Sequence, residues 1–106
     1  MAELFAIVLT TLPAEADAEA LARTLVTERL AACVNILPLM SSIYRWEGKV
    51  EQASERQLVI KTAGSSVDRL KARLAALHPY DVPEILVIPI ADGGEAYLEW
   101  LEASVD

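Results

Sequence analysis

The sequence predicts a mixed α/β fold in which strands and helices follow one another as β-α-β-β-α-β, with a short helix last. Short runs rich in Val, Ile and Leu are typical of buried strands. Two intervening segments repeat apolar residues every three or four positions, as amphipathic helices do. Proline and glycine residues separate most of these segments. The 106 residues suffice for one domain, so we expect a single domain over residues 1–106.

The first predicted strand and helix follow directly from this patterning. Residues 4–12 form a nearly continuous apolar run, which favours a central strand ended by Pro13. Residues 14–32 are predicted to form a helix, with Leu21 and Leu25 on its apolar face.

The next two strands are predicted to form a hairpin. Residues 33–46 are rich in Val, Ile and Tyr but include Pro38, which has no N–H to donate to a sheet. We therefore expect an edge strand that is bulged or bent near Pro38. Glu47-Gly48 predicts a tight turn, and residues 49–62 form the returning strand.

The remaining elements are bounded by capping and breaking residues. Ser65-Ser66-Val67-Asp68 predicts a capping box at the start of the second helix, and Pro79 stops that helix. Residues 84–91 form the fourth predicted strand, with Pro89 inside it. Gly93-Gly94 then leads into the last helix.

Right-handed crossovers place the first and third strands at the centre of an antiparallel sheet. The result is a ferredoxin-like βαββαβ sandwich with a short C-terminal helix. Both edge strands are apolar and contain a proline, whereas a monomer would protect its edges with charge. Together with a hydrophobic content of 54%, this predicts a homo-oligomer whose subunits cover the edges.

Charge and cysteine content exclude several classes of function. A net charge of -7 repels phosphate backbones and anionic lipids, so we expect no nucleic-acid partner and no membrane association. The single cysteine, Cys33, allows no disulfide within the chain. No secretory signal and no apolar stretch of about 18 residues is present, so we expect a cytoplasmic protein.

The sequence lacks the residues that proteins of this fold use for several common activities. A metallochaperone would carry Cys-x-x-Cys after the first strand, where Thr10-Thr11-Leu12-Pro13 stands. An RNA-recognition motif needs aromatic residues on its third strand, and residues 58–62 have none. No catalytic set of residues stands out, so we expect no enzyme, although an unfamiliar enzyme stays an open third class.

Cys33 and Glu55 are interpreted as structural positions. A free cysteine is usually a small buried hydrophobe, so Cys33 is expected to be buried and slow to react. Glu55 lies among polar residues, and we expect it on a solvated face.

Four other residues leave two interpretations open. His78 stands at a helix end, as a dipole partner or as a ligand and proton carrier. Tyr44 and Trp46 share one strand face, where they serve packing or form a ligand platform. Lys61 ends an apolar strand, where it emerges into solvent or meets a ligand.

These residues also carry a resemblance that covers nearly the whole chain in order. The sequence resembles the CutA family of divalent-ion-tolerance proteins. The matching stretches are Leu30-Ala31-Ala32-Cys33-Val34-Asn35, Pro38, Ser42-Ile43-Tyr44-Arg45-Trp46-Glu47-Gly48, Lys61-Thr62, His78-Pro79-Tyr80, Pro83-Glu84 and Tyr97-Leu98-Glu99-Trp100.

The resemblance implies a tight homotrimer, similar in architecture to the PII-type signalling proteins. It also implies a link to copper and other divalent cations. Our leading interpretation is therefore a cytosolic protein of divalent metal ion (copper) tolerance and homeostasis, with weak divalent-cation binding and no evident catalysis. The alternative is a PII-like protein that binds a small anionic ligand at inter-subunit clefts. Whether a small ligand or a partner protein is also involved stays open.

Strand positions and residue chemistry predict where ligands bind. A shared cleft at the trimer interface is predicted to be lined by Tyr44, Trp46, Lys61, His78, Tyr80 and Glu84. His78, the only histidine, is the predicted metal ligand for Cu(II), Zn(II) or another divalent cation, and no organic cofactor is expected. Some members of the family carry a cysteine where Thr10 stands and a second histidine where Leu77 stands, which makes a Cu(I) site of that type inconsistent with this sequence.

Overall fold

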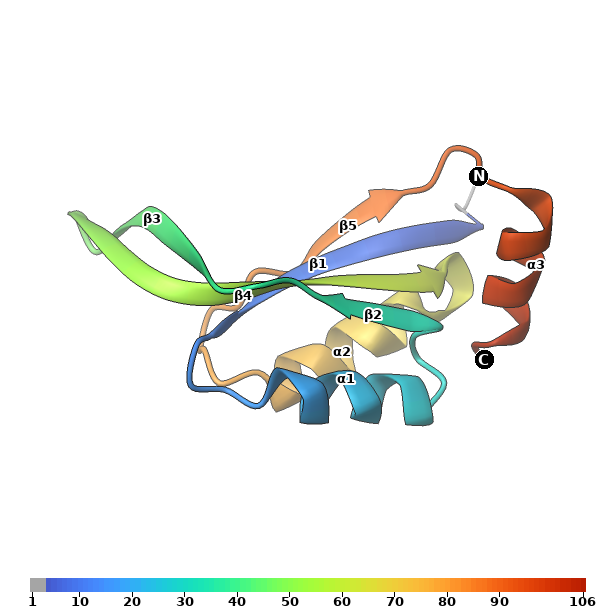
Figure 1. The fold of residues 1–106 in the computed structure, drawn as a ribbon, viewed down its shortest axis with the longest axis horizontal. Helices are drawn as coiled ribbons and strands as arrows, with labels where there is room; N and C mark the ends of the chain where they lie inside the picture. Colours follow the sequence, from blue (N-terminus) through green and yellow to red (C-terminus); the bar gives the residue numbers. More distant parts are fainter. Residues whose placement is uncertain (1–3) are drawn as a thin grey trace.

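The computed structural model describes residues 4–106 and has the predicted order of elements, with the second predicted strand divided in two (Figure 1). In chain order the elements are β1 (Phe5–Pro13), α1 (Ala18–Thr27), β2 (Cys33–Ile36), β3 (Met40–Trp46), β4 (Lys49–Ala63), a 3-10 turn (Gly64–Ser66), α2 (Val67–Leu77), β5 (Leu86–Pro89) and α3 (Glu95–Ala103). None of the helices in this described part has the length and apolar character needed to cross a membrane.

The sheet is antiparallel and has the order β2-β4-β1-β5, with β3 paired to the far part of β4. The predicted central position of the first and third strands is therefore confirmed. The longest pairing joins β1 to β4 over nine residues, from Phe5 opposite Ala63 to Pro13 opposite Glu55.

The break between β2 and β3 lies at the predicted bend. Pro38 has no N–H, and the three residues from 37 to 39 leave the strand conformation. Beyond the break, β3 and the first part of β4 form a hairpin, which we call the arm, that extends past the helices (Figure 1). At its tip Glu47 and Gly48 have φ angles of 49° and 80°, and such a pair of positive φ angles is typical of a type I′ turn.

The first helix is shorter than residues 14–32. The Asp17 side chain accepts a hydrogen bond from the Ala20 N–H at 3.0 Å, which caps the helix one residue before Ala18. At the other end, Arg29 takes a φ of 60°, and this left-handed conformation ends the helical path.

The predicted capping box at the second helix is wrong. Ser66 occupies the N-cap position, but its side chain makes no capping hydrogen bond. Its hydroxyl donates instead to the backbone oxygen of Asp106, which also accepts a hydrogen bond from Arg69 at 2.7 Å. A partner distant in sequence has therefore replaced the local one.

The core lies between one face of the sheet and the helices α1 and α2 (Figure 1). Its fully buried aliphatic side chains come from both layers, and they include Val8, Leu58, Ile60, Leu25, Leu70 and Leu74. A second, smaller cluster joins Leu101 of α3 to Ala63 and Ala32 at the end of the sheet farther from the arm.

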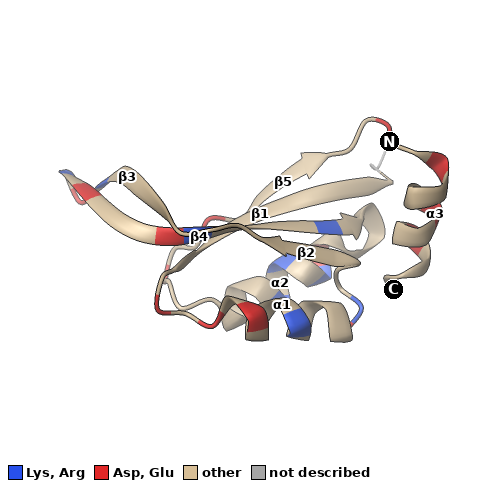
Figure 2. Cartoon of the chain, viewed as in Figure 1, with Lys and Arg blue, Asp and Glu red and all other residues tan. Residues whose placement is uncertain are grey.

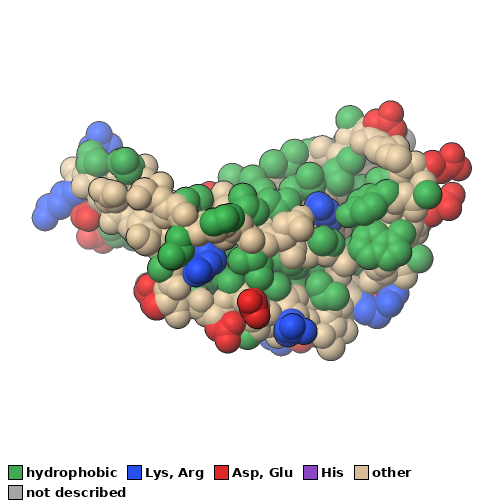
Figure 3. All heavy atoms as spheres, in the orientation of Figure 1, with side chains coloured by type: hydrophobic (Ala, Val, Ile, Leu, Met, Phe, Trp, Pro, Cys, Tyr) green, Lys and Arg blue, Asp and Glu red, His purple; other side chains and the backbone are tan. Residues whose placement is uncertain are grey.

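The other face of the sheet is apolar and is left uncovered by the described helices. Because Val8 points to the helices, its neighbours Ile7 and Leu9 point the other way, and they stand opposite Ile88 and Leu86 of β5. Leu86 and Ile88 are 53% and 44% exposed. β1, β2 and β5 carry no charged residue (Figure 2), and hydrophobic side chains gather over β1, β5 and α3 in the view of Figure 3.

Two buried threonines provide a matched test of this core. Thr62 donates its hydroxyl to the Leu30 carbonyl at 2.8 Å, whereas the equally buried hydroxyl of Thr10 has no partner in residues 4–106. We expect Thr62→Val to lower the free energy of unfolding by about 1–2 kcal/mol, because it leaves a carbonyl unpaired. Thr10→Val should be neutral or stabilising, and urea unfolding at one protomer concentration measures both. Equal losses in the two variants would contradict this account.

Candidate functional site

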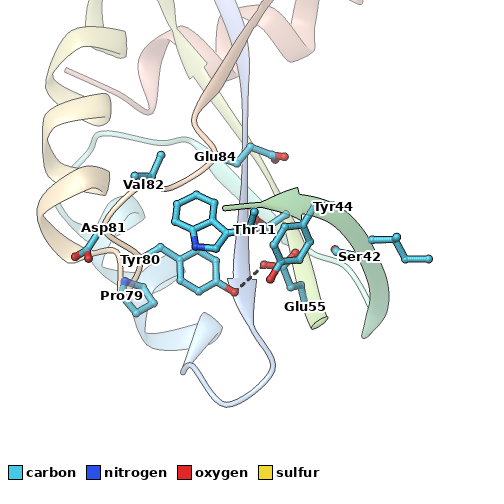
Figure 4. Close-up of a pocket in the computed structure, with 11 residues that line it drawn as sticks. Thr11, Ser42, Tyr44, Glu55, Pro79, Tyr80, Asp81, Val82 and Glu84 are labelled. Carbon is cyan, nitrogen blue, oxygen red and sulfur yellow. Dashed lines mark hydrogen bonds between the residues drawn. The ribbon is translucent and has the colours of Figure 1, made fainter. Parts of the chain in front are cut away.

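A pocket of about 760 Å³ lies between the arm and the loop of residues 79–84 (Figure 4). Pockets for small molecules commonly measure ~300–1,000 Å³. Its lining consists of Thr11, Ser42, Ile43, Tyr44, Trp46, Glu55, Pro79, Tyr80, Asp81, Val82 and Glu84. Four of the six residues predicted to share a cleft are in this set, namely Tyr44, Trp46, Tyr80 and Glu84.

The aromatic part of the pocket comes from two segments distant in sequence. Tyr44 and Trp46 are alternate residues of β3, and they are 43% and 49% exposed. Tyr80 belongs to the loop that follows α2. Because β3 pairs with β4, Tyr44 and Trp46 lie beside this loop. All three aromatic residues therefore line one pocket.

Glu55 is buried, so the prediction of a solvated face is wrong. Only 7% of this residue is exposed, and its Oε2 accepts a hydrogen bond from the Tyr80 hydroxyl at 2.7 Å (Figure 4). The register explains the burial, because Glu55 lies between Pro13 of β1 and Met40 of β3.

The hydroxyl of Tyr80 stays protonated well into the alkaline range. Burial raises its pKa most, and the adjacent Glu55 carboxylate raises it further through the hydrogen bond and the negative charge. Tyr80 is therefore a hydrogen-bond donor throughout the physiological range.

The other charges of the pocket are also negative. Oε2 of Glu84 accepts a hydrogen bond from Gln57 Nε2 at 2.9 Å, and the same Nε2 donates to the Thr10 carbonyl at 2.7 Å. Asp81 contributes a third carboxylate from the loop. Among residues 4–106, the lining of this pocket includes no Lys or Arg. The pocket is therefore chemically suited to a positively charged group.

Lys61 does not join this pocket. It lies six residues beyond Glu55 along β4, which corresponds to about 20 Å of extended strand. Its neighbours across the sheet are Ile7 and Cys33, and its Nζ is 6.0 Å from the ring centre of Tyr97 on α3. Within one subunit Lys61 and Tyr44 therefore lie apart, and a shared cleft between subunits stays a prediction.

His78 has a structural role in this conformation. Only 8% of the residue is exposed, its Nε2 lies 2.7 Å from the Thr11 carbonyl, and its Nδ1 accepts a hydrogen bond from the Tyr80 N–H at 3.0 Å. The assigned tautomer therefore carries its proton on Nε2, and both nitrogens are engaged. The imidazole ties the loop to β1 and positions Tyr80.

The predicted metal site at His78 therefore does not fit. Neither ring nitrogen has a lone pair free to bind a cation. Within residues 4–106, no group of three or more His, Cys, Asp and Glu side chains is arranged to hold a metal ion. A closed metal site needs several convergent ligands.

Cys33 is less buried in one subunit than was predicted. It begins β2 opposite Lys61 on the uncovered face of the sheet and is partly exposed in one subunit. Its burial as a structural thiol would require another subunit to cover this face.

Sequence reasoning missed Glu55, Asp81 and Thr11 in the pocket. Glu55 meets Tyr80 from 25 positions away, and no local pattern encodes that contact. The available sign for Glu55 was its position inside the predicted strand of residues 49–62, which was expected at the centre of the sheet, where a buried carboxylate needs a donor.

Comparison with known proteins identifies relatives over almost the whole chain. The family model described as CutA1 divalent ion tolerance protein matches residues 6–104, which confirms the resemblance found in the sequence. A curated relative from Thermus thermophilus, named divalent-cation tolerance protein CutA, is 53% identical over 95 residues, 90% of this chain and 92% of the relative. Protein CutA, chloroplastic, from Arabidopsis thaliana is 47% identical over 98 residues, 92% of this chain and 54% of that protein.

The fold is also shared with a solved structure. The divalent cation tolerance protein (Cut A1) from Thermus thermophilus matches with a TM-score of 0.93 and 48% identity. The match covers 97% of this chain and 100% of that chain. The two chains are therefore similar in backbone structure as well as in sequence.

The hydroxyl of Tyr80 predicts a specific alkaline response. Below pH ~10 both folded and unfolded chains keep the phenol protonated, so it adds no pH dependence. Above this pH the unfolded chain releases a proton that the folded chain retains because the pKa of Tyr80 is raised, so stability falls. We expect wild type to lose stability between about pH 10 and 12 more steeply than Tyr80→Phe in urea unfolding. Parallel losses in the two proteins would refute the assignment.

Proposed function

Because the chain belongs to the CutA1 family of divalent ion tolerance proteins, we propose that it serves divalent-cation tolerance in the cytoplasm as a homotrimer that binds and does not catalyse. The uncovered apolar face of the sheet is the observation that supports a homotrimer. Family membership supports the role in divalent-cation tolerance, and we propose that copper is one of the cations.

Two features of the sheet support association. Every residue of β5 is exposed, although Leu86, Val87 and Ile88 are aliphatic and have no charged neighbour on the strand. Burial of such surface stabilises an assembly by roughly 25 cal/mol per Å². The opposite edge of the sheet is formed by β2 and β3, so one protomer presents two different free edges. Unlike edges that meet between neighbouring copies generate a closed ring when the rotation permits.

A weak interaction with Cu(II) or another divalent cation belongs to this proposal, without His78 as its ligand. The described part of one chain gathers no ready-made ligand set, so exposed carboxylates and water are the donors to expect. Oxygen donors of this kind suit Cu(II) better than Cu(I), which prefers sulfur.

The alternative of a small anionic ligand loses support from the chemistry of the pocket. Glu55, Asp81 and Glu84 would repel an anion, and the one predicted cation, Lys61, lies elsewhere on β4. A cytoplasmic location is compatible with a lone Cys33 that needs no oxidising environment. The Arabidopsis relative is named as chloroplastic, so the compartment is specific to each protein.

The assembly has a direct test with a matched pair of substitutions. Ile88 on β5 and Val26 on α1 are 44% and 41% exposed, but only Ile88 belongs to the strand at the uncovered face. We expect light scattering to give a trimer for wild type and for Val26→Asp. Ile88→Asp should give monomers, because a buried unpaired carboxylate opposes association. A trimer that survives Ile88→Asp would exclude this face as the contact.

Cation tolerance is tested in a host that lacks its own copy of such a protein. We expect the wild-type chain to restore growth in elevated Cu(II), and we expect His78→Gln to do the same if it folds. In calorimetry, Cu(II) affinity of folded His78→Gln should stay close to wild type, not fall ~10-fold or more as loss of metal-site support does. A large loss of affinity with the fold intact would return His78 to the site.

A further inference from the structure

The pocket beneath the arm holds a buried negative charge that the protein only partly satisfies. Glu55 is more than nine-tenths buried, and its Oε2 is occupied by the Tyr80 hydroxyl. Its other oxygen, Oε1, has no hydrogen-bond partner within residues 4–106, and the residue lines the pocket. Because the residue lines the pocket, Oε1 is available to accept a hydrogen bond from an N–H donor of a ligand that enters the pocket.

Two more carboxylates line the same hollow at separate points. One oxygen of Glu84 accepts a hydrogen bond from Gln57, and Asp81 belongs to the loop of residues 79–84. Neither carboxylate forms a salt bridge within the described chain. In Figure 4, Asp81, Glu55 and Glu84 lie at different corners of the pocket and do not converge. This spacing does not suit a single metal ion, which needs ligands around one point.

The walls between the carboxylates are aromatic and aliphatic. The rings of Tyr44, Trp46 and Tyr80 and the side chain of Val82 supply this surface. Ring faces attract ammonium and guanidinium groups, and apolar walls pack against methylene chains. Carboxylates that can bind cationic groups are thus separated by apolar surface that can pack against a hydrocarbon chain.

We propose that this pocket binds a linear aliphatic polyamine, with its ammonium groups at the separated carboxylates and its methylene chain along the aromatic walls. The proposal goes beyond divalent-cation tolerance, since it requires no metal ion. A quaternary ammonium fits less well because it has no N–H to donate to Glu55. An anion is repelled by all three carboxylates.

Calorimetry of the intact protein with spermidine tests the proposal. We expect saturable binding at one site per protomer, and we expect Glu55→Gln to weaken it about 10-fold or more, because a charge-assisted hydrogen bond is lost. The amide oxygen can still accept from Tyr80, so the fold should persist. Glu84→Gln, expected to weaken binding in the same direction, is the second variant if Glu55→Gln does not fold.

Glu99→Gln provides the matched control. Glu99 is exposed on α3, at the opposite end of the molecule from the arm, and the substitution removes the same charge (Figure 1). Affinity in Glu99→Gln should stay near wild type if the pocket is the site. Equal weakening in Glu99→Gln and the pocket variants would mean general attraction to an acidic protein and would overturn the proposal.

A fluorescence titration locates the ligand independently. In a Trp100→Phe background Trp46 is the only tryptophan, so its emission reports directly on the pocket. We expect spermidine, but not citrate, to change this emission with the affinity measured by calorimetry. No change with spermidine, as when a neighbouring subunit fills the pocket, would overturn the proposal, and so would a response to citrate.

Discussion

The antiparallel pairing of β1 with β4 is the constraint on which the other features depend. Its nine-residue register fixes which side chains of both strands face the helices, and the paired segment has two distant ends. Glu55 lies at the end beneath the arm, and Lys61 lies near the end beside α3. The acidic pocket and the lysine are therefore held apart by the most extensive interaction in the molecule, and no local rearrangement brings them together.

Local patterning predicted the parts of the fold that depend on nearby residues. The order of elements, the central strands, the turn at Gly48 and the bend at Pro38 all follow from periodicity and backbone chemistry. The errors arose where a distant partner decides the conformation. Ser66 binds the backbone of Asp106 in place of its own helix, and α1 ends where Arg29 turns and binds the side chain of Asp106 at 2.8 Å.

The candidate site was predictable only in part for the same reason. Alternation along one strand places Tyr44 and Trp46 on one face, so their shared position needs no tertiary information. The role of His78 depends on the Thr11 carbonyl, 67 positions away, which engages one of its nitrogens. Residue type indicates that an imidazole binds something, but only the fold decides whether its partner is a metal ion or the protein itself.

Lys61 constrains how copies of this chain associate. It emerges on the uncovered sheet face between Ile7 and Cys33, and its nearest aromatic contact is Tyr97, at the outer limit of a favourable distance. An interface that sealed this face dry would bury an ammonium group against aliphatic side chains, at a cost of several kcal/mol. Association through β5 and the sheet edges avoids this cost if water or a neighbouring carboxylate reaches Lys61. The apolar face therefore favours assembly, while the charge of Lys61 limits which arrangements are stable.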